Sequence, residues 1–150
     1  MKIKALILLT VISTLILSSC GQSVNGIPKD QFSTAEQVAY DFTKAMYSGK
    51  ESNQYRAMND LMSKDNSLIA MMSSMKDDGV FSEHYSDIKV MKLIKEKEKG
   101  ETIRYILLKL TNGEGSRENI VSVYKTKVQL IFAPNDKIGK EGFERLRKKF

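Results

Sequence analysis

The sequence predicts an α+β domain in which N-terminal helices pack on a bent antiparallel sheet. Two observations carry this prediction. Between residues 33 and 78, apolar side chains recur every three or four positions, as they do along amphipathic helices. After Gly79 the pattern changes to runs rich in Ile, Val, Leu and Tyr, separated by glycine-containing turns. We therefore expect three helices to cover one face of the sheet.

The helix ends are marked by capping residues. Glu36 follows Ser33 at the spacing of a capping box, so the first helix is expected to begin after Ser33. The second helix is expected from about residue 51 to residue 62. Asp65 is the expected N-cap of a third, shorter helix, which the run Asp77-Asp78-Gly79 ends.

Three apolar runs predict the strands, over residues 88–94, 102–110 and 119–132. Turn signals at residues 99–101 and 112–115 separate these runs, which favours an antiparallel meander joined by hairpins. The third run is long for one flat strand.

Two details of the strands predict how the sheet bends and where it ends. Phase changes in the apolar pattern near Met91 and Tyr124 predict bulges, which bend a sheet. Beyond the sheet, residues 139–150 predict either a terminal helix with Phe143, Leu146 and Phe150 inward, or a partly ordered tail.

The first twenty-two residues have the layout of a secretory signal. Lys2 and Lys4 precede an apolar run over residues 5–17, which is followed by Ser18, Ser19 and Cys20. The run is too short to span a bilayer as a helix, which needs about 20 apolar residues. The small residues end at the only cysteine of the chain. This pattern resembles the bacterial lipoprotein signal, whose lipobox is a leucine, two small residues and an invariant cysteine.

The resemblance implies cleavage between Ser19 and Cys20 and a diacylglycerol on the Cys20 thiol. Two acyl chains anchor a protein stably, whereas one holds only marginally. The chain is then expected to divide into a signal peptide (1–19), a lipidated cysteine with a flexible tether (20–32) and a domain (33–150). The bilayer is the expected partner of Cys20, and the location is the extracytoplasmic face of the cell membrane. An ordinary secretory signal with a cysteine nearby by chance is the alternative.

The positive charge of the chain is concentrated at its C-terminus. The formal net charge is +6, of which Lys2 and Lys4 carry two, and six basic against two acidic residues lie within residues 137–150. The rest of the chain is balanced and lacks the basic face with stacking aromatics typical of a nucleic-acid binder. The tail is expected either to contact an anionic membrane or polyanion or to be a solvated helix face. Its candidate contact residues are Lys140, Arg145, Arg147, Lys148 and Lys149.

The helix from Thr34 to Met46, the glycine after it, the second helix and the long C-terminal strands together resemble the NTF2-like superfamily. In small lipoproteins this fold is often described as cystatin-like. The resemblance covers about residues 33–133 and is a pattern of elements. It implies helices packed on a bent sheet, often with a cavity between them. Some members are enzymes and many are binding or assembly modules, so the fold alone does not imply a function.

His84 and the methionines are the residues with candidate chemistry. His84 is the only histidine and a candidate general base, although a surface histidine at the helix-to-sheet junction is the favoured interpretation. The sequence predicts no metal site and no cofactor, since the usual zinc-ligand sets need a second histidine or a free thiol. The clustered methionines could bind soft copper, fill an irregular core or line an adaptable groove, and their helical spacing favours the core. They are Met58, Met62, Met71, Met72 and Met75.

The sequence favours a non-enzymatic, membrane-anchored envelope lipoprotein that presents a small domain to a protein partner. Nucleic acid is not expected as a partner. The alternative is a small-ligand-binding or isomerase- or hydratase-like protein of the NTF2-like fold, which would use the cavity between helices and sheet. That alternative predicts a pocket on which a carboxylate or His84 converges. A third interpretation is a purely structural envelope module.

Overall fold

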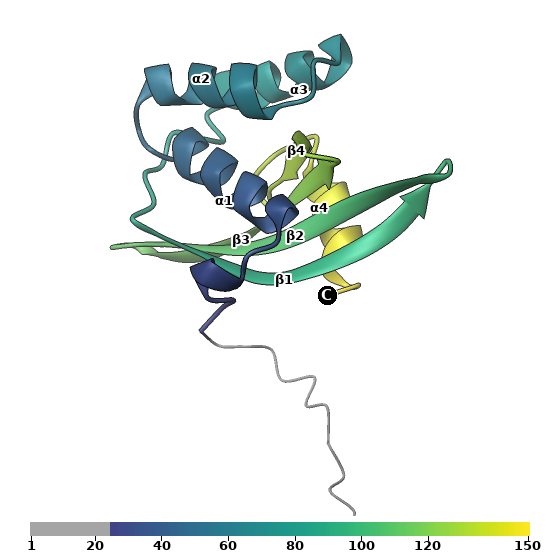
Figure 1. Ribbon diagram of the computed structural model, residues 1–150. Coiled ribbons are helices and arrows are strands. Elements are labelled where there is room, and N and C mark those ends of the chain that lie inside the picture. Colours follow the sequence, from purple (N-terminus) through teal and green to yellow (C-terminus); the bar gives the residue numbers. More distant parts are fainter. Residues whose placement is uncertain (1–24) are drawn as a thin grey trace, which may run out of the picture.

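The computed structural model describes residues 25–150, and Figure 1 shows helices stacked over one face of a sheet. The sheet has four antiparallel strands in the order β1-β2-β3-β4, so each strand pairs with its neighbour in the sequence. The predicted α+β class with an antiparallel meander is confirmed. The elements are η1 (Lys29–Gln31), α1 (Thr34–Met46), α2 (Glu51–Leu61), α3 (Asn66–Asp77), β1 (Asp87–Glu98), β2 (Glu101–Asn112), β3 (Gly115–Tyr124), β4 (Lys127–Phe132) and α4 (Lys140–Arg147).

Side-chain caps fix the starts of α1 and α3. The Ser33 hydroxyl accepts from the Glu36 N–H at 3.4 Å, and the Glu36 carboxylate accepts from the Ser33 N–H at 2.6 Å. This is the predicted capping box. The Asp65 carboxylate accepts from the N–H groups of Ser67 (2.8 Å) and Leu68 (3.2 Å), which confirms Asp65 as the N-cap of α3.

β1 and β2 form a long hairpin that turns at Lys99 and Gly100, both with positive φ angles of 49° and 85°. The pairing of the two strands shifts between Val90 and Lys92. The predicted bulge at Met91 is therefore confirmed, and a bulge of this kind bends the strand that carries it.

The prediction of one strand over residues 119–132 is wrong, because this stretch contains most of β3, a turn and β4. The chain reverses at Lys125 and Thr126, and Lys125 takes a left-handed φ of 54°. The predicted irregularity near Tyr124 is present, because the β3–β4 pairing shifts between Ser122 and Val123, but the hairpin turn that follows it was not predicted. The usual residues of such turns are asparagine, aspartate and glycine, so the pattern contained no turn signal here.

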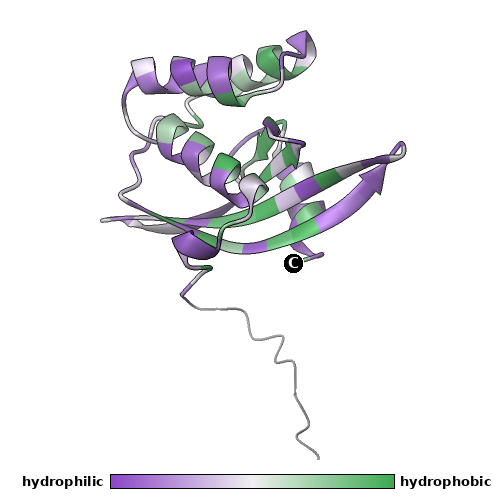
Figure 2. Cartoon of the chain, viewed as in Figure 1, coloured by the Kyte–Doolittle hydropathy of each residue, from purple (hydrophilic) through white to green (hydrophobic). Residues whose placement is uncertain are grey.

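The main core lies between the sheet and the first three helices. Phe42 and Met46 of α1 pack against a face of the sheet that carries Val90, Leu108 and Val121, all fully buried. Figure 2 shows hydrophobic residues along the middle of the strands beneath α1, while the end of β1 is hydrophilic. We call this side of the sheet the α1 face.

A second, smaller core lies on the opposite face of the sheet, beneath α4. Leu146 is fully buried there against Tyr105 and Ile120, and Phe143 and Phe150 pack on the same cluster. Of the two alternatives for residues 139–150, the structure has the helix, with the expected three side chains inward. The sheet is thus covered on both faces, whereas the prediction covered only one.

The last residues of the expected tether pack on the domain. The Ile27 N–H donates to the Val90 carbonyl at 2.7 Å, alongside β1. Gly26 is buried with a φ of 75°, and a Cβ at this position would come within 2.9 Å of the Val90 oxygen. Phe32 packs on Tyr40 with ring centroids 5.7 Å apart. Residues 26, 27 and 32, which were expected to belong to the tether, are therefore packed on the domain.

The expected cleavage and lipidation residues, Ser19 and Cys20, lie outside the described residues, as does the apolar run before them. Within residues 25–150, no helix has both the length and the hydropathy needed to cross a membrane.

Candidate functional site

α1 lies across the α1 face of the sheet, and the surroundings of its two ends differ. The C-terminal end of α1 is closed by a stacked cluster around Arg117. The guanidinium of Arg117 lies 4.8 Å from the ring centroid of Tyr47 and 4.9 Å from that of Tyr85. It donates to the Val80 carbonyl at 3.2 Å and approaches the Glu83 carboxylate at 3.7 Å. We call these residues the closed end.

Burial raises the pKa of both tyrosines at the closed end. The Tyr47 hydroxyl is fully buried and accepts from the Asn119 amide at 2.8 Å, and burial raises its pKa to about 12. The pKa of Tyr85 is also raised to about 12, by burial and then by its hydrogen bond to Glu83. Both hydroxyls therefore stay protonated at neutral pH, and the cluster acts as a neutral aromatic frame around one cation.

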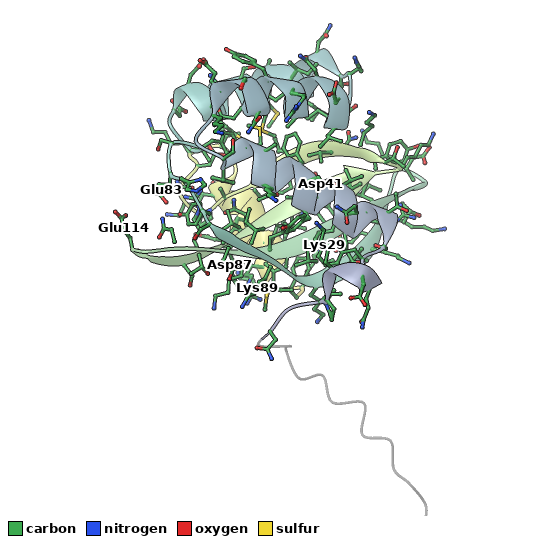
Figure 3. All side chains as sticks on the ribbon, turned by 60° about the vertical axis from the view of Figure 1, so that its left-hand side comes forward. Lys29, Asp41, Glu83, Asp87, Lys89 and Glu114 are labelled. Atoms are coloured by element: carbon green, nitrogen blue, oxygen red, sulfur yellow. The ribbon has the colours of Figure 1, made fainter. Side chains whose placement is uncertain are left out.

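Acidic side chains surround the closed end. Figure 3 shows Glu83 and Glu114 at the same end of the molecule. Glu114 also contributes to raising the pKa of Tyr85, because its negative charge disfavours the phenolate. Arg117 is therefore matched by negative charge as well as by aromatic rings.

His84 is exposed at the surface beside the closed end. Its Nδ1 lies 3.0 Å from the Tyr47 carbonyl, and with Tyr40 and Lys44 it lines a hollow of 300 Å³. Among the described residues that line this hollow, none is a carboxylate. His84 is thus at the helix-to-sheet junction, as expected, and the structure does not bring an acidic side chain into the hollow beside it.

The clustered methionines fill the main core. Met58, Met62, Met72 and Met75 are buried in it, and Met71 packs against it half-buried. Thioethers suit this position because they adapt to irregular gaps. This is the core interpretation that their helical spacing favoured.

The aspartates at the two ends of α3 are explained by the helix itself. Asp65 caps α3, and Asp77 and Asp78 are exposed at its end. Among residues 25–150, no group of three or more His, Cys, Asp or Glu is placed to hold a metal ion.

At the N-terminal end of α1 lies a hollow of 580 Å³, which we call the open end. Three cations line it, each from a different part of the sheet: Lys95 from β1, Arg104 from β2 and Lys125 from the β3–β4 turn. Lys95 and Arg104 are direct partners in the β1–β2 register. Within residues 25–150, neither of these two side chains has an ion-pair or hydrogen-bond partner.

The remaining wall of the open end comes mainly from the first turn of α1. Ser33 and Glu36 line it together with the apolar side chain of Leu93 on β1. Glu36 is the one carboxylate among these described lining residues, and it is buried and held by the Ser33 N–H. Three cations against one carboxylate leave the open end with a formal charge of +2.

The five candidate residues of the basic tail do not form one free cationic surface. Arg147 is bonded to Glu118 through two contacts of 2.5 and 3.2 Å, and Lys149 lies 2.5 Å from Glu96. The other three are exposed and, within residues 25–150, have no ion-pair partner. These three are Lys140, Arg145 and Lys148.

Sequence reasoning missed the open end, although one signal for it was present. The turn at residues 99–101 was recognised, and counting outward from it pairs Lys95 with Arg104. The contribution of Lys125 could not be found in this way, because its turn was itself missed. The stacking of Arg117 on Tyr85 and Tyr47 joins segments that are far apart in the sequence and had no local signal.

Comparisons of the chain with protein-family models, with curated proteins and with solved structures each found no match.

Proposed function

We propose that the chain is a lipid-anchored, non-enzymatic domain of a bacterial cell envelope that meets a protein partner at the extracytoplasmic face of the membrane. The proposal starts from the lipobox-like order of the N-terminal residues. The observation that carries it further is the docking of Gly26 and Ile27 on β1. A chain that is fixed at Gly26 leaves residues 21–25 between Cys20 and the domain, which span about 20 Å at most when fully extended.

Such a short connection would hold one side of the domain near the bilayer. The connection leaves the domain at β1, where the Lys92 side chain donates to the Phe150 carbonyl at 2.7 Å. The C-terminus therefore lies beside the same strand, and Figure 1 shows η1 and the C-terminus on the side away from α2 and α3. Arg145 and Lys148, which have no ion-pair partner among the described residues, are the tail residues best suited to contact anionic headgroups. Each such residue near the surface adds about 1 kcal/mol of binding free energy.

The layer of α2 and α3 would then face outward, where a protein partner approaches. Tyr55 of α2 is 53% exposed, one of the two most exposed large hydrophobic side chains of the described region, and Lys76 lies 4.9 Å from its ring centroid. Tyrosine is enriched at protein interfaces because it combines a large apolar ring with a polar tip. We propose Tyr55 as the anchor of the contact.

We also propose that the domain is a member of the NTF2-like, or cystatin-like, group. Three N-terminal helices on one face of a bent antiparallel sheet support this assignment. Two features differ from the expectation. The space beneath α1 is occupied by buried side chains such as Phe42 and Leu108, and α4 covers the opposite face of the sheet.

The first test replaces Cys20 by alanine in the full chain expressed in its host. We expect Cys20→Ala to move the protein from the membrane fraction to the soluble extracytoplasmic fraction, because the acyl anchor is lost. Mass spectrometry of the unsubstituted protein should find diacylglycerol on a chain that begins at Cys20. A bare thiol, or an unchanged membrane fraction for Cys20→Ala, would refute the anchor.

The second test uses a photo-crosslinking residue at position 55 in intact cells. Ile138, which is 50% exposed in the loop before α4, is the matched control position. We expect a discrete adduct from position 55 that disappears in the Cys20→Ala background, and no adduct from position 138. Equal adducts from both positions would contradict a partner surface on α2 and α3.

The open end favours the alternative function, a small-ligand-binding domain. A hollow with a formal charge of +2, which no further anion among its described lining residues balances, points to an anionic ligand. The chemistry of that ligand can be inferred independently of the anchor.

A further inference from the structure

We propose that the open end binds a phosphomonoester group carried by a small organic molecule or by a lipid headgroup. The site is formed by Lys95, Arg104 and Lys125 around the first turn of α1. The inference does not depend on lipidation of Cys20, because all of these residues belong to the ordered domain.

The register of the sheet is the first argument. Lys95 and Arg104 stand directly opposite each other on neighbouring strands, an arrangement that is destabilising when no anion lies between the charges. Within residues 25–150, neither side chain is paired with a carboxylate. An anionic ligand bound between them would turn this repulsion into attraction.

Protection of the sheet edge explains only one of the two opposing cations. Lysines along an edge strand discourage pairing with other chains, and β1 is an edge strand. This accounts for Lys95. It does not account for Arg104, which lies half-buried on the interior strand β2, between β1 and β3.

The orientation of α1 is the second argument. The N-terminal end of a helix carries a partial positive charge, and Thr34 and Ala35 of the first turn line the hollow. The protein thus adds a positive helix end to a group of three cations, and among the described lining residues only Glu36 opposes them. The Glu36 carboxylate is engaged by the capping box, which leaves the cations of the sheet for a ligand.

Charge and size indicate the ligand class. A formal charge of +2 matches a phosphomonoester, which carries up to two negative charges near neutral pH. The planar fork of Arg104 and the point charges of the two lysines suit phosphate oxygens. The volume of 580 Å³ lies in the range of small-ligand pockets, roughly 300–1,000 Å³, and Leu93 and Ala35 offer apolar wall to an organic substituent.

The test is a calorimetric titration of the full chain, purified in mild detergent, with phenyl phosphate at about 0.15 M salt. We expect saturable binding that Arg104→Gln and Lys95→Gln each weaken by about tenfold or more, since each removes a charge-assisted contact. Lys140→Gln is the matched control, because Lys140 is an exposed cation outside the hollow, and it should change the affinity by less than about twofold.

A stability measurement keeps the test independent of folding. Phenyl phosphate should raise the melting temperature of the unsubstituted protein but not that of Arg104→Gln, because only a bound ligand stabilises the folded state. If Arg104→Gln lowers the melting temperature, the titration is repeated with Lys125→Gln, because Lys125 lies in a turn outside the strand pairing.

Three results would overturn the proposal. The first is no saturable binding of phenyl phosphate. The second is equal weakening by Lys140→Gln and Arg104→Gln, which would mean diffuse attraction to net charge. The third is tighter binding of succinate than of phenyl phosphate with the same dependence on Arg104, which would make the site one for carboxylates.

A vesicle assay separates the two sources of the phosphomonoester. The Cys20→Ala chain, which has no acyl anchor of its own, is sedimented with vesicles of phosphatidic acid or of phosphatidylglycerol at equal surface charge. Arg104-dependent sedimentation with phosphatidic acid alone assigns a lipid headgroup, because only that lipid is a monoester. Binding of phenyl phosphate without such sedimentation assigns a soluble ligand. Either result supports the site.

Discussion

Arg117 and Arg104 lie on the same face of the same sheet, yet within the described part of the chain only Arg117 has side-chain partners. Arg117 is stacked between two tyrosines, bonded to a carbonyl and close to a carboxylate. Arg104 faces Lys95 and, within residues 25–150, has no partner for its side chain. The comparison indicates that Arg117 stabilises the fold at the closed end, whereas Arg104 at the open end is available to bind a ligand.

The direction of α1 accounts for the difference. Arg117 lies beside the C-terminal end of α1, whose partial negative charge stabilises a cation. The cations of the open end lie beside its N-terminal end, whose partial positive charge repels them. One helix therefore stabilises the first arginine and destabilises the second, unless an anion is bound.

The largest expected effect comes from replacing each arginine by methionine, which keeps most of the apolar side-chain volume. Arg117→Met should lower the free energy of unfolding by about 3 kcal/mol, since it removes two cation–π contacts and leaves the Val80 carbonyl without its hydrogen bond. Arg104→Met should change it by less than about 0.5 kcal/mol. Urea denaturation measures both. Equal losses would show that the two ends do not differ as described.

Alkaline pH should weaken the closed end next. The pKa of Tyr47 is about 12 in the folded protein against 10.0 for an exposed tyrosine. Above pH 10 the unfolded chain loses a proton that the folded chain keeps, so the free energy of unfolding falls by about 2 kcal/mol by pH 12. Below pH 10 this contribution is constant.

Denaturation curves between pH 8 and pH 12 check that slope. Tyr47→Phe should reduce it, because phenylalanine has no proton to lose, while Tyr85 and Tyr105, whose pKa values are also raised by burial, keep their own contributions. A slope that Tyr47→Phe does not reduce would contradict the role of burial at the closed end.

The smallest expected effect concerns the capping box at the open end. Ser33→Ala should lower the free energy of unfolding by about 1 kcal/mol, because the Glu36 N–H loses its acceptor. Thr34→Ala, one residue further along and exposed, should have almost no effect or a slightly stabilising one. Thermal unfolding of the two variants side by side checks this, and equal losses would mean that the cap does not fix the start of α1.

The parts of the fold that depend on local chemistry were predictable. Ser33 and Asp65 marked helix starts because capping acts over three residues, and Met91 marked a bulge because the alternation slips there. The turn at Lys125 was not predictable, since its left-handed residue is a lysine and not a glycine or asparagine. One strand was therefore expected where two exist.

The site was less predictable than the fold because it depends on pairing between strands. The tail was expected to carry free positive charge, but Arg147 and Lys149 are ion-paired with Glu118 and Glu96 from distant strands. The cations of the open end are scattered along the sequence: the register brings Lys95 beside Arg104, and the β3–β4 turn brings Lys125. Docking of Gly26 was equally hidden, because a segment with tether composition gives no indication that a strand edge will bind it.

The docking of Gly26 and Ile27 has a consequence for how neighbouring copies coexist. β1 is an outer strand, and these two residues lie along it at Val90, between Lys89 and Lys92. If copies are anchored in one membrane, they diffuse at the same height and meet side to side. Exposed edge strands of neighbouring copies could then pair with each other. The polypeptide that leads to the bilayer would then also shield the strand nearest to it, so that crowded copies remain separate.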